Sequence, residues 1–195
     1  ADDGAISVSD AASLTNANTI NNYTTGQVTL TSVSDTVANI TSIDGLTTTQ
    51  VSMAGATVSI TDTGASKTQV DTVNGFTTGT VTPTSISEDK ADITTLQGTT
   101  GISLATTNIT VTDQVNKSEA DTINGYTTGQ VVLNSSSMTV TELAAVEALN
   151  DSVMKFADDG AISVSDAASL TNANTINNYT TGQVTLTSVS DTVAN

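Results

Sequence analysis

The chain contains no cysteine, histidine, arginine or tryptophan, and only one proline among its 195 residues. Without cysteine a disulfide framework is impossible, and without cysteine and histidine a zinc site of the usual kind is impossible too. The same two absences remove the usual pairs of nucleophile and base. We therefore predict no catalytic site and no enzyme activity.

Positive charge and long apolar runs are also scarce. The only basic side chains are four lysines, and 20 acidic residues bring the net charge to −16. This charge repels duplex DNA and anionic membranes. No apolar run approaches the roughly 18 residues that a membrane-spanning helix needs. We expect neither nucleic-acid binding nor membrane insertion.

Most of the polar residues are uncharged, and serine and threonine alone make up about a third of the chain. Charged residues contribute only 12% and aromatic residues 3%. Disordered segments are usually highly charged, and they lack regularly spaced Val, Ile and Leu. Because this chain has that spacing and little charge, we expect it to fold.

The last 39 residues repeat the first 39 without a change, at an offset of 156 residues. Repetition at a fixed period is typical of solenoids and other repeat proteins. We interpret residues 1–156 as one full tandem repeat and 157–195 as the start of the next. The chain then reads as a window from a longer array, which agrees with the lack of a secretion signal at Ala1.

The 156-residue repeat divides into three related units, at about 5–57, 58–108 and 109–161. The phrase TTGQV or TTGTV recurs at 24–28, 77–81, 127–131 and 180–184, and an aromatic residue precedes each copy. We predict that these aromatic residues occupy equivalent, largely buried positions and form one internal stack: Tyr23, Phe76, Tyr126 and Tyr179.

Each unit is predicted to run strand, helix, strand, helix, strand. Alternating segments such as ISVSD and VTLTS have the period of strands, and apolar residues spaced by three or four predict short helices between them. Parallel or mixed strands are expected to begin at Val28, Val51, Val81, Ile102, Val131 and Val153. The predicted fold class is α/β, a repeat solenoid of short strands and short helices, and a mainly-β solenoid is the alternative.

The phrases VTD, DTINGYTTGQV and VTELAAVEAL resemble the Thr-rich tandem repeats of giant bacterial surface proteins, including giant adhesins and the so-called β-strand-repeat proteins. The resemblance covers the whole chain. It implies an extracellular, bacterial cell-surface location and a structural or adhesive role.

Acidic residues supply two sets of candidate site residues. One Asp closes the first strand of each unit, and it is interpreted either as a helix N-cap or as a calcium ligand. The Asp-Asp-Gly turns are the other calcium candidates, although no EF-hand loop is present. The first set is Asp10, Asp62, Asp113 and Asp166, and the second is Asp2, Asp3, Asp158 and Asp159.

Threonine and glycine give two further patterns. Thr-x-Thr strands, as at 29–31, 82–84 and 185–187, would present hydroxyl pairs outward, which suits either an ordinary strand or a face that binds carbohydrate or ice. The glycines of the TTG phrases are predicted to have left-handed backbone at helix C-termini. They are Gly26, Gly79, Gly129 and Gly182.

Together these features predict a structural repeat segment of a giant extracellular bacterial protein. It would form a fibre, sheath, surface layer or adhesin stalk, with other copies of itself as partners. The alternative is a carbohydrate- or ice-binding module. No resident cofactor is predicted, and calcium and surface glycans remain the open candidates as ligands.

Overall fold

The computed structural model describes residues 3–46 and 50–191. Within these residues it contains seven helices and three parallel sheets, so the fold is mixed α/β. The helices exclude the mainly-β alternative. The chain divides into two compact units, the first made of Ala1–Ile86 and Thr95–Thr107 and the second of Ser87–Thr94 and Asn108–Asn195.

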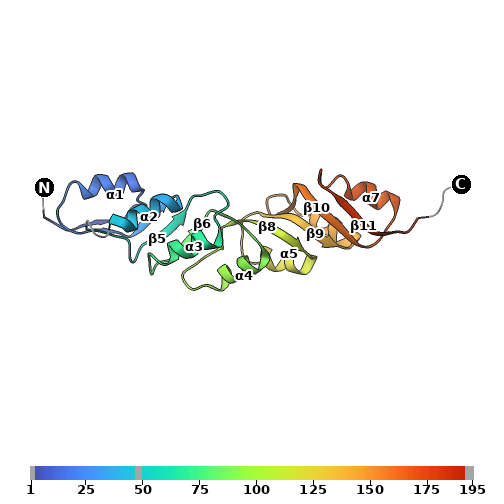
Figure 1. The fold of residues 1–195 in the computed structure, drawn as a ribbon, viewed down its shortest axis with the longest axis horizontal. Coiled ribbons are helices and arrows are strands. Elements are labelled where there is room, and N and C mark those ends of the chain that lie inside the picture. The colour runs from blue at the N-terminus through green and yellow to red at the C-terminus, as the bar shows by residue number, and fades with distance from the viewer. Residues whose placement is uncertain (1–2, 47–49, 192–195) are drawn as a thin grey trace. The chain divides into compact units, whose positions relative to one another are not determined.

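The first unit is built on two three-stranded parallel sheets with strand orders β1-β2-β4 and β3-β5-β6. Its helices α1 and α2 lie side by side (Figure 1). The elements are β1 (Ile6–Val8), α1 (Leu14–Asn21), β2 (Val28–Leu30), β3 (Ser32–Asp35), α2 (Val37–Gly45), β4 (Val51–Ser52), β5 (Thr57–Ile60), α3 (Lys67–Asn74) and β6 (Val81–Pro83).

The second unit is built on a sheet of order β11-β10-β9-β8-β7. The boundary between the units falls within β7 (Ser85–Glu88) and within α4 (Lys90–Gly98). Helix α7 packs on β10 and β11 (Figure 1). The remaining elements are β8 (Asn108–Val115), α5 (Lys117–Asn124), β9 (Val131–Met138), α6 (Val140–Glu147), β10 (Met154–Ala168), α7 (Leu170–Ile176) and β11 (Val184–Val189).

The helices are short, as predicted, and their sequences explain where they start. Ser66 and Asn116 begin α3 and α5 with capping boxes, in which the cap and the third helical residue bond each other's backbone N–H groups. Helices α2 to α6 each bury two apolar residues spaced by three, such as Val70 and Val73 in α3, whereas α1 and α7 each bury one. Two turns cannot bury more than this narrow apolar stripe, so these helices depend on the sheets they cover.

Strand β10 is longer than its two neighbours, with 15 residues against 8 in β9 and 6 in β11. It has three paired parts, 154–156, 161–164 and 167–168. Its first two parts pair with β9, and its last two pair with β11. The pairing thus shifts by one part across β10, from its first two parts with β9 to its last two parts with β11.

Most of the predicted strand starts are confirmed. Val28, Val51, Val81 and Val131 are the first residues of β2, β4, β6 and β9. Two starts differ: Ile102 forms a single parallel bridge with Val81, and Val153 lies one residue before β10. The shift at Val153 has a simple cause, because Met154 is the residue that faces the core while Val153 is exposed.

Where both copies are described, at 3–35 and 159–191, the identical segments adopt the same pairing in the two units. Ile6 pairs with Val28 and Val8 with Leu30, and in the second copy Ile162 pairs with Val184 and Val164 with Leu186. Helix α7 in the second copy corresponds to α1 in the first. The local sequence therefore specifies the same strand, helix and register in two different surroundings.

The prediction of an internal aromatic stack is wrong. Tyr23 is 68% exposed, and Phe76, Tyr126 and Tyr179 are only partly buried. The buried ring is Phe156, which lies outside the repeating phrase and stacks on Tyr179 with ring centroids 6.2 Å apart. The core of each unit is instead aliphatic, because a two-turn helix directs its stripe of Val and Ile at the sheet and leaves the aromatic residue just beyond its end.

Candidate functional site

The Asp residues that close the first strands cap helices, but not the helices that follow them. Each carboxylate accepts a hydrogen bond from the first backbone N–H of the helix that precedes it in the chain, and the separation is 23–26 residues. Orphan N–H groups at a helix start favour such an acceptor. The pairs are Asp62 with Val37 (2.6 Å), Asp113 with Lys90 (2.9 Å) and Asp166 with Val140 (2.8 Å).

Two further carboxylates that sequence reasoning missed play the same role. Asp35 and Asp191 occupy identical positions in the two copies, and each accepts from the first N–H of the helix before it, Leu14 or Leu170, at 2.9 Å. The signal in the sequence was the SVSD phrase, which ends a short strand as VSITD ends a long one. Asp10 is exposed, whereas its counterpart Asp166 accepts from the Val140 N–H.

The Asp35 carboxylate accepts hydrogen bonds from three groups. Partial burial raises its pKa, but hydrogen bonds from the Leu14 N–H, the Asn39 side chain and the Thr36 N–H outweigh burial, so the net pKa is lowered. A lowered folded-state pKa means that the carboxylate stabilises the fold above its unfolded pKa. This stabilisation is lost as the pH falls through the folded pKa.

We expect Asp35→Ala to lower the free energy of unfolding by about 1–2 kcal/mol at pH 7, since it removes a capping acceptor. The difference from the unsubstituted chain should shrink as the pH falls from the unfolded pKa through the lower folded pKa of Asp35, and it should vanish once the native carboxylate is protonated. Urea unfolding at a series of pH values measures both effects. Asp10→Ala is the control, and an equal loss from it would contradict the capping role.

The TTG phrases connect neighbouring strand layers through buried hydroxyls. The first Thr of the phrase donates to a backbone C=O in the preceding layer and accepts from the N–H of the Gly two residues later. We call this pair the Thr-Gly clasp. The hydroxyls of Thr24, Thr77 and Thr180 donate to Gly4, Ala56 and Gly160, each at 2.6 Å, and accept from Gly26, Gly79 and Gly182 at 2.8, 2.9 and 2.8 Å.

The glycines of the clasps are required because two strand layers approach closely there, and not because their backbone is left-handed. Among the described glycines only Gly64 and Gly101 have positive φ, so the prediction of left-handed backbone for the TTG glycines is wrong for Gly26, Gly79, Gly129 and Gly182. A Cβ atom on Gly79 would stand 2.2 Å from the Ala56 carbonyl oxygen, and one on Gly182 would stand 2.3 Å from that of Asp159. The layers approach too closely there for any side chain.

The Asp-Asp-Gly turns do not gather a set of calcium ligands in the described residues. Asp3 is exposed, the Asp158 side chain is 94% exposed and lies 3.7 Å from the Lys155 ammonium, and Asp2 lies outside the described residues. Across 3–46 and 50–191, no group of three or more acidic side chains is placed to hold a metal ion. Asp159 is exposed as well, and Gly160 beside it accepts the Thr180 clasp.

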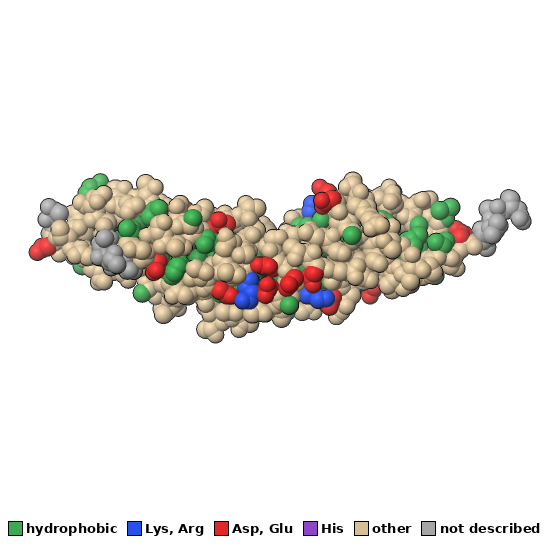
Figure 2. All heavy atoms as spheres, in the orientation of Figure 1, with side chains coloured by type: hydrophobic (Ala, Val, Ile, Leu, Met, Phe, Trp, Pro, Cys, Tyr) green, Lys and Arg blue, Asp and Glu red, His purple; other side chains and the backbone are tan. Residues whose placement is uncertain are grey.

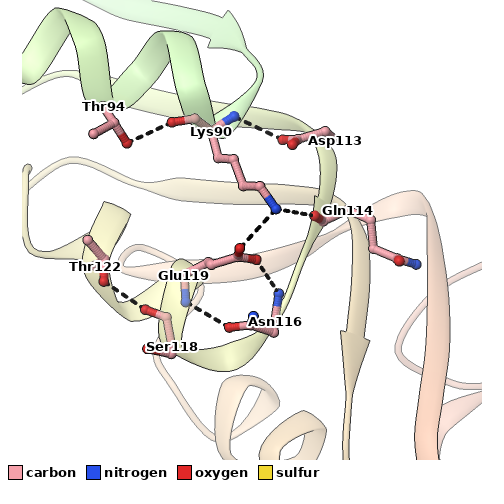
Figure 3. A network of polar contacts seen from close by, with 8 residues as sticks. All are labelled: Lys90, Thr94, Asp113, Gln114, Asn116, Ser118, Glu119 and Thr122. Carbon is pink, nitrogen blue, oxygen red and sulfur yellow. Dashed lines mark hydrogen bonds and ion pairs between the residues drawn. The ribbon is translucent and has the colours of Figure 1, made fainter.

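A hollow of about 410 Å³ lies in the second unit between the first turns of α4 and α5, and an ion-pair network borders it (Figure 3). The Lys90 ammonium contacts the Glu119 carboxylate at 2.9 Å and donates to the Gln114 C=O at 3.3 Å. The other Glu119 oxygen accepts from the Asn116 N–H at 2.9 Å. The bond to Glu119 raises the pKa of Lys90, while the Asn116 and Lys90 bonds lower that of Glu119.

The network links the first turns of α4 and α5 by geometry. The other three lysines are likewise ion-paired: Lys67 with Asp71, Lys117 with Asp121 and Lys155 with Asp158. On the face drawn in Figure 2, charged side chains are few and most of the surface is neutral. The hollow therefore offers no activated nucleophile and no unbalanced charge.

The Thr-rich strand face is partly engaged by the fold itself. The Thr31 hydroxyl donates to the Val8 C=O at 2.9 Å, and the Thr187 hydroxyl donates to the Val164 C=O. Thr29 and Thr185 are exposed. In two of the three predicted hydroxyl pairs, one hydroxyl thus links two strands, which weakens a regular outward array.

One buried polar group has no such role. Ser136 in β9 is fully buried, and within the described part of the chain its hydroxyl has no hydrogen-bond partner. Ser136 pairs with Val115, the last residue of β8. The equivalent positions are held by Val33, which pairs with Ala12, and by Ile86, which pairs with Ala65. A buried hydroxyl without a partner is destabilising, because it has lost its hydrogen bonds to water.

We expect Ser136→Ala to raise the free energy of unfolding by about 1 kcal/mol, because the unpaired hydroxyl is removed. Ser135→Ala, at a half-exposed neighbour, should change stability by no more than about 0.5 kcal/mol. Urea unfolding of the two variants in parallel measures the difference. A loss of stability from Ser136→Ala would mean that the hydroxyl has a partner in solution.

Comparison with known protein families, with curated proteins and with solved structures finds no match. No helix in the described residues is long and apolar enough to span a membrane. The function must therefore be argued from the repeated geometry itself.

Proposed function

We propose that this chain is a structural repeat segment of a giant extracellular bacterial protein. Its strands and helices stack as a solenoid that serves as the body of a fibre, sheath, surface layer or adhesin stalk. The proposed role is mechanical: the segment lengthens the protein and keeps it extended. This role requires many equivalent layers and no catalytic group.

The observation that carries this proposal is the complementary burial of the two identical segments. Ile162 is 1% exposed beneath β9, whereas its counterpart Ile6 is half-buried in β1, the outermost strand of its sheet. At the other side of the segment the order reverses: Val28 is fully buried under β4, and its counterpart Val184 is only partly buried. The same segment buries its apolar residues fully only where a neighbouring strand pairs with it on both sides.

The bonds between layers support the same function. Asp side chains reach back to cap the preceding helix, and Thr-Gly clasps reach back to the preceding strand layer. Both link segments about 20–26 residues apart, so they hold each layer to its neighbour. In a repeat protein the stability is the sum of such nearest-neighbour terms, and it increases as layers are added.

The alternative of a carbohydrate- or ice-binding module has less support. Tyr23 exposes most of its ring, as a sugar-stacking residue would, but the identical Tyr179 stacks on Phe156 supplied by the preceding layer. Burial raises the pKa of the Tyr179 hydroxyl, with a contribution from Glu147. The exposure of Tyr23 is therefore explained by a missing neighbour.

Chains with two and three complete repeats test the proposal. If each repeat adds six strand layers at about 4.8 Å, the maximum dimension in small-angle scattering should grow by roughly 29 Å per repeat at constant cross-section. The urea midpoint should rise with repeat number, because each junction adds a layer contact.

The matched control has a flexible Gly-Ser linker inserted between otherwise identical repeats. It should lose the rise in urea midpoint, since the linker removes the contact at the junction but keeps the composition. Midpoints that do not change with repeat number in the uninterrupted chains would show independent domains and would overturn the solenoid.

A further inference from the structure

We infer that two separate copies of this chain dock head to tail, with the outer side of β11 in one copy pairing in parallel with the outer side of β1 in the next. The inference rests on the proposed stacking and names its partner and register. The predicted register places Ser188 opposite Ala5, Val189 opposite Ile6, and Ser190 opposite Ser7. These two strands are each the outermost of their sheet.

The pairing of β3 with β5 in the first unit indicates this register for β11. Strand β3 has the same sequence as 188–191, and it pairs on its far side with β5, Ser32 opposite Thr57 and Val33 opposite Val58. The Thr57 N–H donates to the Thr31 C=O at 3.0 Å. In the docked pair, the Ala5 N–H of one copy would make the same bond to the Thr187 C=O of the other.

The second unit supplies the register independently from the β1 side. Residues 161–163 have the same sequence as 5–7, and they pair with β9, Ala161 opposite Ser135 and Ile162 opposite Ser136. Ser136 and Val33 hold equivalent positions, since each also pairs with the end of the preceding long strand. Two registers read from different sheets thus converge on one pairing, Val189 with Ile6.

Burial and charge favour the contact. Val189 is 63% exposed, whereas its counterpart Val33 is fully buried against β5, so docking would cover a valine that the fold elsewhere encloses. None of the residues at 5–7 or 188–190 is charged, and Asp191, which follows directly, accepts a hydrogen bond from the Leu170 N–H of its own copy. Because the two surfaces differ, the contact is heterologous and leaves another outer strand at each end, which gives open chains.

Sedimentation velocity of the 195-residue chain over a range of concentrations, in 0.15 M salt with EDTA, tests the inference. The average mass should grow with concentration and reach no plateau. Val189→Lys should abolish this growth, because the ammonium would be buried in the docked pair. Leu170→Lys is the matched control: Leu170 is 61% exposed, the charge change is the same, and association should persist.

A mixing experiment tests the direction of docking. Ser7→Pro removes the N–H that β1 turns outward, since the neighbouring Ile6 N–H donates inward to the Gln27 C=O. Val189→Lys and Ser7→Pro should each be monomeric alone and should form a one-to-one dimer when mixed. Circular dichroism checks that both variants remain folded, and the Val189→Lys and Leu170→Lys pair decides the matter if Ser7→Pro does not.

A chain that stays monomeric at every concentration, or equal association of Val189→Lys and the unsubstituted chain, would overturn the docking. Dimerisation of Val189→Lys or of Ser7→Pro alone would show a symmetric contact and would overturn it as well. Neither result touches the proposed function, which is decided by the stability and length of covalently joined repeats. Independent unfolding of those repeats would remove the proposed function whatever the separate chains do.

Discussion

Gly79→Ala is expected to destabilise the fold by about 3 kcal/mol or more, since the new Cβ cannot be placed without moving backbone. The nearest atoms are the carbonyl oxygen and carbon of Ala56, at 2.2 and 2.6 Å, and neither belongs to a flexible side chain. Relief requires the two strand layers to separate, which would also stretch the Thr77 clasp. Urea unfolding followed by circular dichroism measures the loss.

Gly98→Ala is the matched control. Gly98 lies at the end of α4, and no heavy atom would come within 4 Å of its new Cβ. This substitution should leave stability unchanged or raise it by up to about 1 kcal/mol, because alanine restricts the unfolded chain. If the two variants unfold at the same urea concentration, close packing of layers at Gly79 is not what the glycine provides.

Thr77→Val is expected to cost about 2–4 kcal/mol although it preserves the volume of the side chain, because two backbone groups lose their partner. The Thr77 hydroxyl donates to the Ala56 C=O at 2.6 Å and accepts from the Gly79 N–H at 2.9 Å. Thr77 is buried, so water does not readily replace either bond. Urea unfolding at neutral pH measures the effect.

Thr77→Ser keeps the hydroxyl and removes only a methyl group, so it should lose much less stability than Thr77→Val. Thr72→Val is a second control, because the exposed Thr72 hydroxyl bonds only the Thr68 C=O within its own helix. It should change stability by no more than about 0.5 kcal/mol. Equal losses from Thr77→Ser and Thr77→Val would assign the effect to packing and would contradict the clasp.

The sequence by itself determined the local elements and their repetition. Alternation of Val or Ile with Ser or Thr located β2, β4, β6 and β9, because a strand has a period of two and one face is buried. Apolar residues spaced by three or four located the short helices. The exact copy of 1–39 at 157–195 implied that both segments fold alike, and they do so down to strand register.

Only the tertiary structure shows which neighbouring layer each side chain contacts. Asp62 was interpreted as a possible cap of the helix that follows it, but it bonds Val37 in the preceding helix, a partner 25 residues away that no local pattern indicates. Gly79 and Thr77 looked like parts of a turn, and their role depends on a carbonyl of another layer. Tyr23 and Tyr179 have identical neighbours in sequence and different burial, because burial depends on what is stacked against a segment. Local patterns fix backbone geometry within a few residues, whereas contacts between layers depend on how strands 21–26 residues apart are aligned, and only the folded sheet sets that alignment.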